Sequence, residues 1–338
     1  MNSIIKKIKI IFFTIALTTC WNFYSQTNEI EKNLDTLFQK ALQSKTFNGN
    51  VLIAEKGKII YEKAFGQADA SNSVPLNTDY RFHIGSIAKE FNAVGIMILK
   101  EQGKLKLDDP ISKFLPELPS WANKIKIINL LQYTSGLPQI KWNEVNQDSD
   151  NMAFLQKTSE LDFEPGTKYD YNNNNVFLQR RIIEKITNMS FNSFVIKKIL
   201  KPNGIKNAVV DPDEKEKLFA KSYNSKGKQD ILKYNISGWT ALTLKDFYKW
   251  SEAINSFKII NQESTRELFV PFSKDNQTGL GGGTIENGKV TNHIHDGAAF
   301  NYQALLISNL NSTIILMTNN KQNNLEEISG SIQNILDK

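Results

Sequence analysis

The chain has 338 residues, of which 40% are hydrophobic, and a formal net charge of +6. This length and apolar content are sufficient for a packed core, and interleaved helical and strand-like segments exclude a disordered or fibrous chain. Residues 1–25 hold three lysines and no acidic residue, so the rest of the chain carries a formal charge of +3. These charges are interspersed without an arginine-rich run, which excludes a nucleic-acid-binding surface of the usual basic kind.

The N-terminus has the pattern of a secretory signal peptide. Three lysines among the first nine residues precede an apolar run at residues 10–18, and small polar residues follow. We predict a signal peptide over residues 1–25, cleaved near Ser25. The apolar run is shorter than the ~20 residues of a membrane-spanning helix, and the alternative is a short N-terminal anchor that stays attached.

Cys20 is the single cysteine of the chain and ends a segment that resembles a lipoprotein signal. Thr19 departs from that pattern, in which Gly, Ala or Ser is expected. A mature chain that starts after Cys20 can form no intramolecular disulfide. We therefore expect an exported protein, periplasmic or extracellular or held at the envelope as a lipoprotein. Contact with a membrane is expected only through the N-terminal anchor or a lipid on Cys20.

The sequence pattern of the first half of the chain predicts strands followed by helices. Residues 50–61 indicate two strands around a Lys56-Gly57 turn. Apolar residues at helical spacing predict a helix over residues 86–101, which Gly103 ends. Residues 139–170 are polar and read as loop-rich. Further helices are predicted over residues 125–133, 176–186, 191–200 and 244–254, the last with Thr243 as N-cap.

The second half returns to strands. An Asn287-Gly288 turn predicts a hairpin of residues 280–285 and 289–295, and strands 303–308 and 313–318 precede a final helix over 326–336. We therefore predict an α/β (α+β) fold: an antiparallel sheet from both chain ends flanked by helices, with a mostly helical insertion at roughly residues 105–240. One domain would span residues 26–338, with a cleft where sheet and insertion meet.

Ser86 and Lys89 form the first candidate site. The spacing Ser-x-x-Lys occurs at Ser3, Ser86 and Ser225, but only Ser86 opens an apolar helix. Positions i and i+3 share a helix face, so Lys89 can reach the Ser86 hydroxyl, and the free N–H groups of a helix N-terminus suit an oxyanion. Lys89 can act as a base only if burial or nearby cations lower its pKa. The alternative is a capping serine and a solvated lysine.

Tyr171 and Asn173 form the second candidate, the sole Tyr-x-Asn of the chain. A tyrosine near cations could share proton transfer, and an asparagine amide could hold a substrate carbonyl. The alternative is an ordinary asparagine-rich turn.

The third candidate is the stretch from His295 to Ala298, which closes a predicted strand. Gly297 would let a substrate approach the backbone, and the N–H of Ala298 could donate to an oxyanion. The alternative is an ordinary strand-end histidine. His293 and His295 share a strand face, as two metal ligands could, but no metal-binding spacing accompanies them. We expect no metal and no organic cofactor.

In this order the three candidates resemble the serine β-lactamase-related superfamily, which includes class C β-lactamases, D-alanyl-D-alanine carboxypeptidases, D-aminopeptidases and β-lactamase-fold esterases. The resemblance covers roughly residues 47–335 and implies the β-lactamase/transpeptidase-like fold. The segments that carry it, in family order, are RFHIGSIAKEF, GKLKLDDPISKFLPELP, LLQYTSGLP, FEPGTKYDYNNNNVFL and ILKPNGIKNA.

The resemblance implies a role for each residue. Ser86 would be the acylated nucleophile and Lys89 its proton acceptor. Tyr171 would serve the leaving group and the incoming water as acid and base. Asn173 would hold the amide carbonyl of the substrate, and the N–H groups of Ser86 and Ala298 would form the oxyanion hole.

Two departures from the family pattern affect substrate choice. His295 takes the place of the lysine in Lys-Thr-Gly, and the resulting His-x-Gly is typical of peptidase and esterase members. Asp296 replaces a small or hydroxyl residue, where a carboxylate would either repel a substrate carboxylate or hold His295 protonated.

The predicted function is a serine hydrolase that cleaves an amide or ester bond through an acyl-enzyme on Ser86. The expected substrate is a small molecule or short peptide: a D-amino-acid peptide, including one derived from peptidoglycan, or a small ester. The alternatives are a β-lactamase proper and a non-catalytic binding protein for cell-wall fragments.

Overall fold

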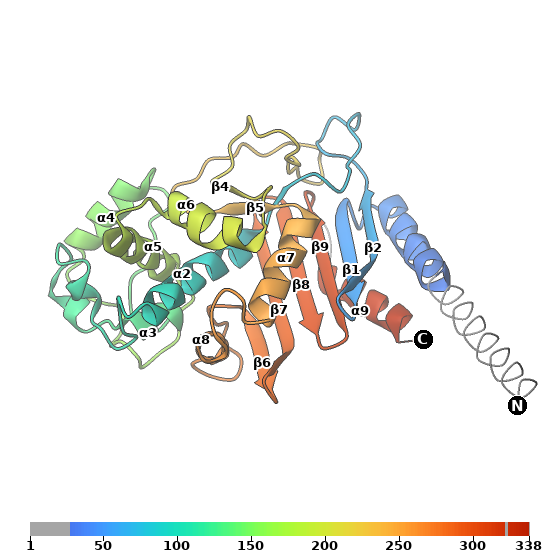
Figure 1. Ribbon diagram of the computed structural model, residues 1–338. Coiled ribbons are helices and arrows are strands. Elements are labelled where there is room, and N and C mark those ends of the chain that lie inside the picture. The colour runs from blue at the N-terminus through green and yellow to red at the C-terminus, as the bar shows by residue number, and fades with distance from the viewer. Residues whose placement is uncertain (1–27, 322–323, 338) are drawn as a thin grey trace, which may run out of the picture.

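The computed structural model describes residues 28–321 and 324–337 (Figure 1). The predicted signal peptide, with Ser25 and Cys20, lies outside the described residues. None of the helices that the structure describes has both the length and the apolar composition of a membrane span.

A six-stranded antiparallel sheet forms the centre of the fold, in the order β2-β1-β9-β8-β7-β6 (Figure 1). Its first and last strands in the chain, β1 and β9, are neighbours, so both ends of the chain build the sheet, as predicted. The strands are β1 Gly49–Glu55, β2 Lys58–Phe65, β6 Gly282–Glu286, β7 Lys289–Ala299, β8 Tyr302–Asn309 and β9 Ser312–Thr318.

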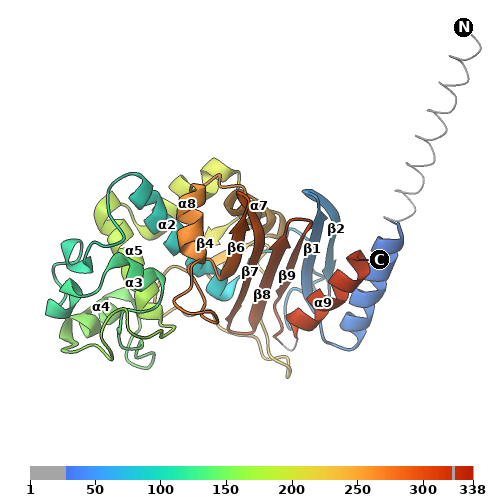
Figure 2. The ribbon, with the colours of Figure 1, turned by 90° about the horizontal axis from the view of Figure 1, so that it is seen from below.

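Helices cover both faces of this sheet (Figure 2). A helix over residues 28–43 and α9 (Leu325–Leu336) bury one face through side chains such as Phe38 and Ile332. The opposite face packs against α7 (Leu244–Asn255) and α8 (Gln262–Phe269). Because both faces are covered, β9 is buried along its whole length.

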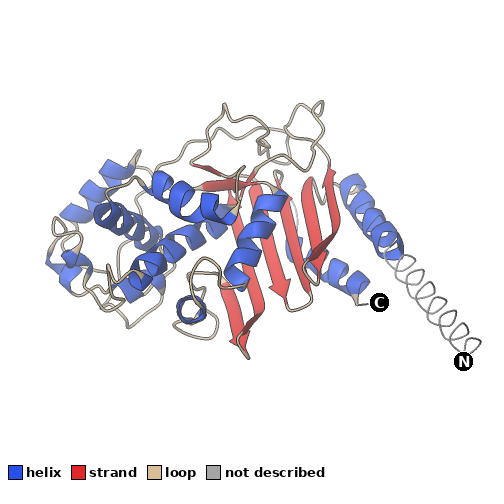
Figure 3. Cartoon of the chain, viewed as in Figure 1, coloured by secondary structure: helices blue, strands red, loops and turns tan. Residues whose placement is uncertain are grey.

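The remaining helices gather beside the sheet, next to the β6 edge (Figure 3). They are α2 Lys89–Glu101, α3 Ile127–Leu131, α4 Asp148–Lys157, α5 Asn173–Thr187 and α6 Phe191–Phe194, with helical turns at Gly85–Ala88, Ile111–Lys113, Ser120–Asn123, Val195–Leu200 and Lys201–Asn203. A small sheet in the order β3-β5-β4 joins the two parts. Its strands are β3 Phe82–His83, β4 Val209–Val210 and β5 Thr240–Leu242.

Several local predictions are confirmed. The turn between β1 and β2 has positive φ at Lys56 and Gly57, and the hairpin turn has it at Asn287 and Gly288. Thr243 caps α7, because its Oγ1 accepts from a backbone N–H of the first turn at 3.2 Å.

Other local predictions are wrong. The stretch 139–170 contains α4, a mostly polar helix with few buried side chains, which periodicity did not indicate. The helix over residues 28–43 and α8 were not predicted. The strand expected to end at His295 continues to Ala299, because its last residues pair with β8. Pairing between strands overrides the turn tendency of Asp296-Gly297.

Candidate active site

Ser86 and Lys89 meet at the junction between the helical region and the sheet. Ser86 lies in a 3-10 turn, Gly85–Ala88, that leads directly into α2. Side chains three residues apart eclipse one another in a 3-10 turn. The Lys89 Nζ accordingly donates to the Ser86 Oγ at 2.8 Å. The interpretation of Ser86 as a helix cap is wrong, because Ile84 is the N-cap of this turn.

Lys89 is buried, not solvated, and its surroundings disfavour the charged form. Burial, and then the positive charge of Arg180, lower the pKa of Lys89 to about 7, against an opposing effect of Asp296. The Nζ lies 5.0 Å from the ring centroid of Tyr171 and 5.6 Å from that of Trp239. A large fraction of Lys89 is therefore neutral at pH 7, and a neutral amine can accept a proton.

Tyr171 borders the same site from the loop that precedes α5. Its ring packs against Tyr133 with 4.8 Å between centroids. Burial raises the pKa of Tyr171 to about 12, although the nearby Ser86 hydroxyl opposes part of the rise. Within the described residues the buried Oη of Tyr171 has no partner in hydrogen-bond geometry, although the Ser86 hydroxyl is nearby. Tyr171 thus holds its proton at neutral pH.

The asparagine run after Tyr171 divides into structural residues and one site residue. Asn172 caps α5 by accepting from the Asn174 N–H at 2.8 Å. The side-chain amides of Asn174 and Asn175 donate to the backbone carbonyls of Pro138 and Asn172. Asn173 instead lines a narrow cavity of about 10 Å³ that also contacts Lys89, Arg180 and Trp239. The alternative of a structural asparagine-rich turn therefore describes Asn172, Asn174 and Asn175, but not Asn173.

Two glycines allow the C-terminal end of β7 to approach the Ser86 turn closely. A Cβ atom on Gly297 would lie 2.1 Å from the Ile84 carbonyl oxygen and 2.9 Å from the Ser86 nitrogen. A Cβ on Gly85, whose φ is +56°, would lie 2.3 Å from the Ala298 nitrogen. The backbone nitrogen atoms of Ser86 and Ala298 therefore both lie close to this contact. Two backbone N–H groups that point at one oxygen are the arrangement that stabilises an oxyanion.

His295 lies in the middle of β7 and points into the protein, so the strand-end interpretation is wrong. It is 3% exposed, and its Nδ1 donates to Glu90 Oε1 at 2.6 Å. Asp296, as the next residue of the strand, points to the opposite face. The carboxylate that holds His295 is therefore Glu90 and not Asp296. The Nε2 of His295 has no partner among the described residues and is the nitrogen left for a ligand.

Glu90 is a residue of the candidate site that the sequence interpretation missed. It is fully buried and also accepts from His293 Nε2 at 3.3 Å and from the Trp250 indole. Although burial opposes the shift, the hydrogen bonds from His293 and His295 lower the pKa of Glu90 to about 2. The available signal was an acidic residue directly after Lys89, inside the apolar start of α2.

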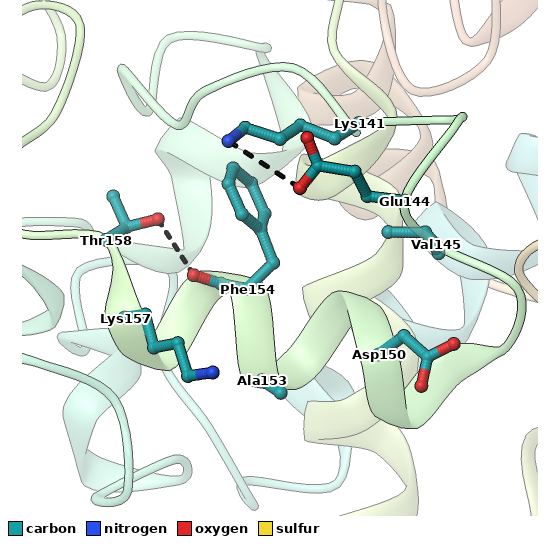
Figure 4. Close-up of a pocket in the computed structure, with 8 residues that line it drawn as sticks. All are labelled: Lys141, Glu144, Val145, Asp150, Ala153, Phe154, Lys157 and Thr158. Carbon is teal, nitrogen blue, oxygen red and sulfur yellow. Dashed lines mark hydrogen bonds and ion pairs between the residues drawn. The ribbon is translucent and has the colours of Figure 1, made fainter.

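A larger hollow lies elsewhere, against α4 (Figure 4). It measures about 520 Å³ and none of the predicted site residues lines it. Its lining residues are Lys141, Glu144, Val145, Asp150, Ala153, Phe154, Lys157 and Thr158. Size alone does not mark the site here, because the chemically distinctive groups gather around Ser86. The described part of the chain brings no three His, Cys, Asp or Glu side chains together as metal ligands.

Comparison with known proteins identifies the family and the fold. The family model described as Beta-lactamase matches residues 34–333. Penicillin-binding protein 4* of Bacillus subtilis is 27% identical, with 86% of this chain and 72% of that protein aligned. A penicillin-binding protein structure from Bacillus halodurans aligns with a TM-score of 0.76, at 21% identity, over 89% of this chain and 98% of that one. The D-amino acid amidase structure from Ochrobactrum anthropi aligns with a TM-score of 0.72, at 19% identity, over 93% and 99%. The fold is the β-lactamase/transpeptidase fold, and the chain belongs to the beta-lactamase family.

Proposed function

We propose that the protein is a serine hydrolase that cleaves an amide or ester bond through an acyl-enzyme on Ser86. The observation that carries the proposal is the 2.8 Å hydrogen bond between Lys89 Nζ and Ser86 Oγ, made by a lysine whose pKa is about 7. A serine hydroxyl is a weak nucleophile until an adjacent base accepts its proton. Lys89 provides that base at neutral pH.

The two titratable neighbours of Ser86 take different roles because their pKa values differ. Lys89, near 7, accepts the Ser86 proton as Oγ bonds to the substrate carbonyl carbon. Tyr171, near 12, keeps its proton and gives it to the leaving amine or alcohol as the acyl–leaving-group bond breaks. The N–H groups of Ser86 and Ala298 hold the oxyanion. Water then attacks the acyl carbon while the deprotonated Tyr171 takes one of its protons, and the bond to Ser86 Oγ breaks as Lys89 returns its proton to that oxygen.

The remaining site residues position the substrate in this proposal. Asn173 holds the amide carbonyl of the substrate. His295, anchored through Nδ1 by Glu90, presents Nε2 to the substrate. Gly297 keeps the β7 edge close to the nucleophile.

For the substrate we propose a D-amino-acid peptide or amide, or a small ester. Support comes from the family, from a relative named a penicillin-binding protein, and from the structural similarity to a D-amino acid amidase. A peptide derived from peptidoglycan fits the predicted export of the chain to the periplasm or cell exterior. The competing functions are a β-lactamase proper and a binding protein without turnover.

Labelling with a fluorophosphonate followed by intact-mass spectrometry tests the mechanism. The wild-type protein should gain one adduct, mapped to Ser86, and Ser86→Ala should gain none while keeping its fold. Ser225→Ala is the matched control, because Ser225 belongs to a second Ser-x-x-Lys but is exposed in a loop. That variant should label like the wild type. A folded wild-type protein that stays unlabelled would contradict the hydrolase and favour the binding protein.

A further inference from the structure

His83 is a buried histidine directly before the Ser86 turn, and the proposed mechanism does not use it. It is the last residue of β3, where it pairs with Ala241 of β5, and its side chain is fully buried. Its ring stacks on Tyr302 with 5.7 Å between centroids, and its centroid lies 5.4 Å from that of Trp239. Strand pairing and aromatic packing therefore fix the place of this imidazole.

The Nδ1 of His83 accepts a hydrogen bond from the Gly85 N–H at 2.9 Å. An asparagine or aspartate oxygen makes the same bond, to the N–H two residues further on, in an Asx turn. Because Nδ1 is the acceptor, the proton of the neutral ring lies on Nε2. Nε2 has no partner among the described residues, so the bond to Gly85 is the one hydrogen bond of this ring within that part of the chain.

The surroundings of His83 keep Nδ1 available as an acceptor. Burial, and then the positive charge of Lys89, lower the pKa of His83 to about 3. A protonated imidazole donates from both nitrogens and would face the Gly85 N–H with a second donor. The neutral ring is therefore the form that holds Gly85 at neutral pH.

Gly85 is a position at which such a bond has consequences for the nucleophile. Its φ is +56°, and a Cβ there would lie 2.3 Å from the Ala298 nitrogen. The residue at this position must be glycine, yet a glycine also reaches other backbone conformations at little steric cost. The dihedral angles of Gly85 set the direction of the next peptide unit, which carries the Ser86 N–H. The bond from Gly85 to His83 thus selects one conformation of the turn.

We propose that His83 is a positioning residue for the nucleophile: through Nδ1 it holds the Gly85 peptide so that the Ser86 N–H and hydroxyl keep their places beside β7. The inference rests on the proposed hydrolase and adds a residue that touches neither the substrate nor the reacting atoms. An oxyanion donor stabilises the transition state more than the bound substrate. Loss of the His83 acceptor should therefore lower kcat and leave KM nearly unchanged.

Three substitutions at His83 separate the acceptor from the ring. His83→Phe keeps an aromatic ring but has no acceptor, and its kcat for p-nitrophenyl butyrate should fall roughly 10- to 100-fold. His83→Asn places an oxygen near the position of Nδ1 and should recover kcat to within ~5-fold of the wild type. His83→Gln places its oxygen near the position of Nε2 and should stay as slow as His83→Phe. The rate of fluorophosphonate labelling should follow kcat in all three.

A control variant and a spectroscopic measurement test for a merely structural role. Tyr302→Phe removes the 2.6 Å hydrogen bond from the Tyr302 hydroxyl to the Ala220 carbonyl, in the same aromatic cluster, and leaves the His83 acceptor intact. Its kcat should equal that of the wild type. In wild-type protein with 15N-labelled imidazoles, the His83 resonances should show a neutral ring protonated on Nε2, without titration from pH 5 to 8. Their loss in His83→Asn identifies them.

The outcomes separate this inference from the function on which it rests. Hydrolysis that depends on Ser86 but keeps the wild-type kcat in His83→Phe overturns the inference and leaves the hydrolase standing. Equal losses in His83→Phe and His83→Asn do the same, as does a proton on Nδ1 in the wild type. Should His83→Phe not fold, the ring proton of the wild type and the comparison of His83→Asn with His83→Gln decide. If the folded wild type neither hydrolyses the ester nor takes a label on Ser86, the hydrolase and the inference are both overturned.

Discussion

Replacing Glu90 by glutamine should lower the free energy of unfolding by about 3 kcal/mol at pH 7. The pKa of Glu90 is about 2 in the folded protein against an ordinary value of 4.5. Each pKa unit corresponds to ~1.4 kcal/mol, so the ionised carboxylate contributes about 3 kcal/mol to stability. Glutamine keeps the size of the side chain but lacks the negatively charged carboxylate that accepts hydrogen bonds from His295 and His293.

The loss of unfolding free energy in Glu90→Gln should decrease as the pH falls. A carboxyl group with a lowered pKa stabilises the fold above its unfolded pKa, and the contribution disappears as the pH falls through the folded pKa. The difference between wild type and Glu90→Gln should therefore be full above pH 5, shrink to about 1 kcal/mol at pH 3, and vanish near pH 2.

Urea unfolding followed by tryptophan fluorescence measures the difference at each pH. Glu117→Gln is the control, because Glu117 is exposed, and its unfolding free energy should stay within ~0.5 kcal/mol of the wild type. The reasoning is refuted if Glu90→Gln costs less than ~1 kcal/mol at pH 7, or if its cost is the same at pH 3 and pH 7. Either result would mean that the buried carboxylate is not held ionised by its histidine partners.

Three further predictions concern the reacting groups. The kcat/KM for a neutral ester should rise with pH around 7, because Lys89 must lose its proton to act as base; a flat profile from pH 5 to 9 would argue against this. Arg180→Met removes a cation that lowers the pKa of Lys89, so the midpoint of the kcat/KM profile should move to higher pH. A move to lower pH would contradict this role of Arg180. Gly297→Ala should slow fluorophosphonate labelling at least ~100-fold, because its Cβ would lie 2.1 Å from the Ile84 carbonyl oxygen. Gly330→Ala, on an open helix surface, should label at the wild-type rate.

The parts of the site that were predictable depend on short-range geometry. The Ser86–Lys89 contact follows from three-residue spacing at a helix start, whether the turn is α-helical or 3-10. The hairpin before His295 follows from Asn287-Gly288, whose residues tolerate positive φ. Such features involve neighbours in the chain, and the local sequence therefore determined them.

The electrostatics of the site depend on contacts between distant segments. Arg180 reaches Lys89 from α5, and Glu90 bonds His295 across 205 positions of the chain. Neither partner could be recognised from spacing, because the pKa of a group depends on how deeply it is buried and on which charges surround it. The same holds for β7, which continues past Asp296 only because β8 pairs with it.

The sequence by itself thus determined the strands at both chain ends, most of the helices between them, the family, and which side chains stand close along the chain. Only the tertiary structure decided that Lys89 is buried and largely neutral, and that Glu90 rather than Asp296 holds His295. The reason is physical: local spacing sets which groups can meet, whereas desolvation and charge depend on everything that packs around them.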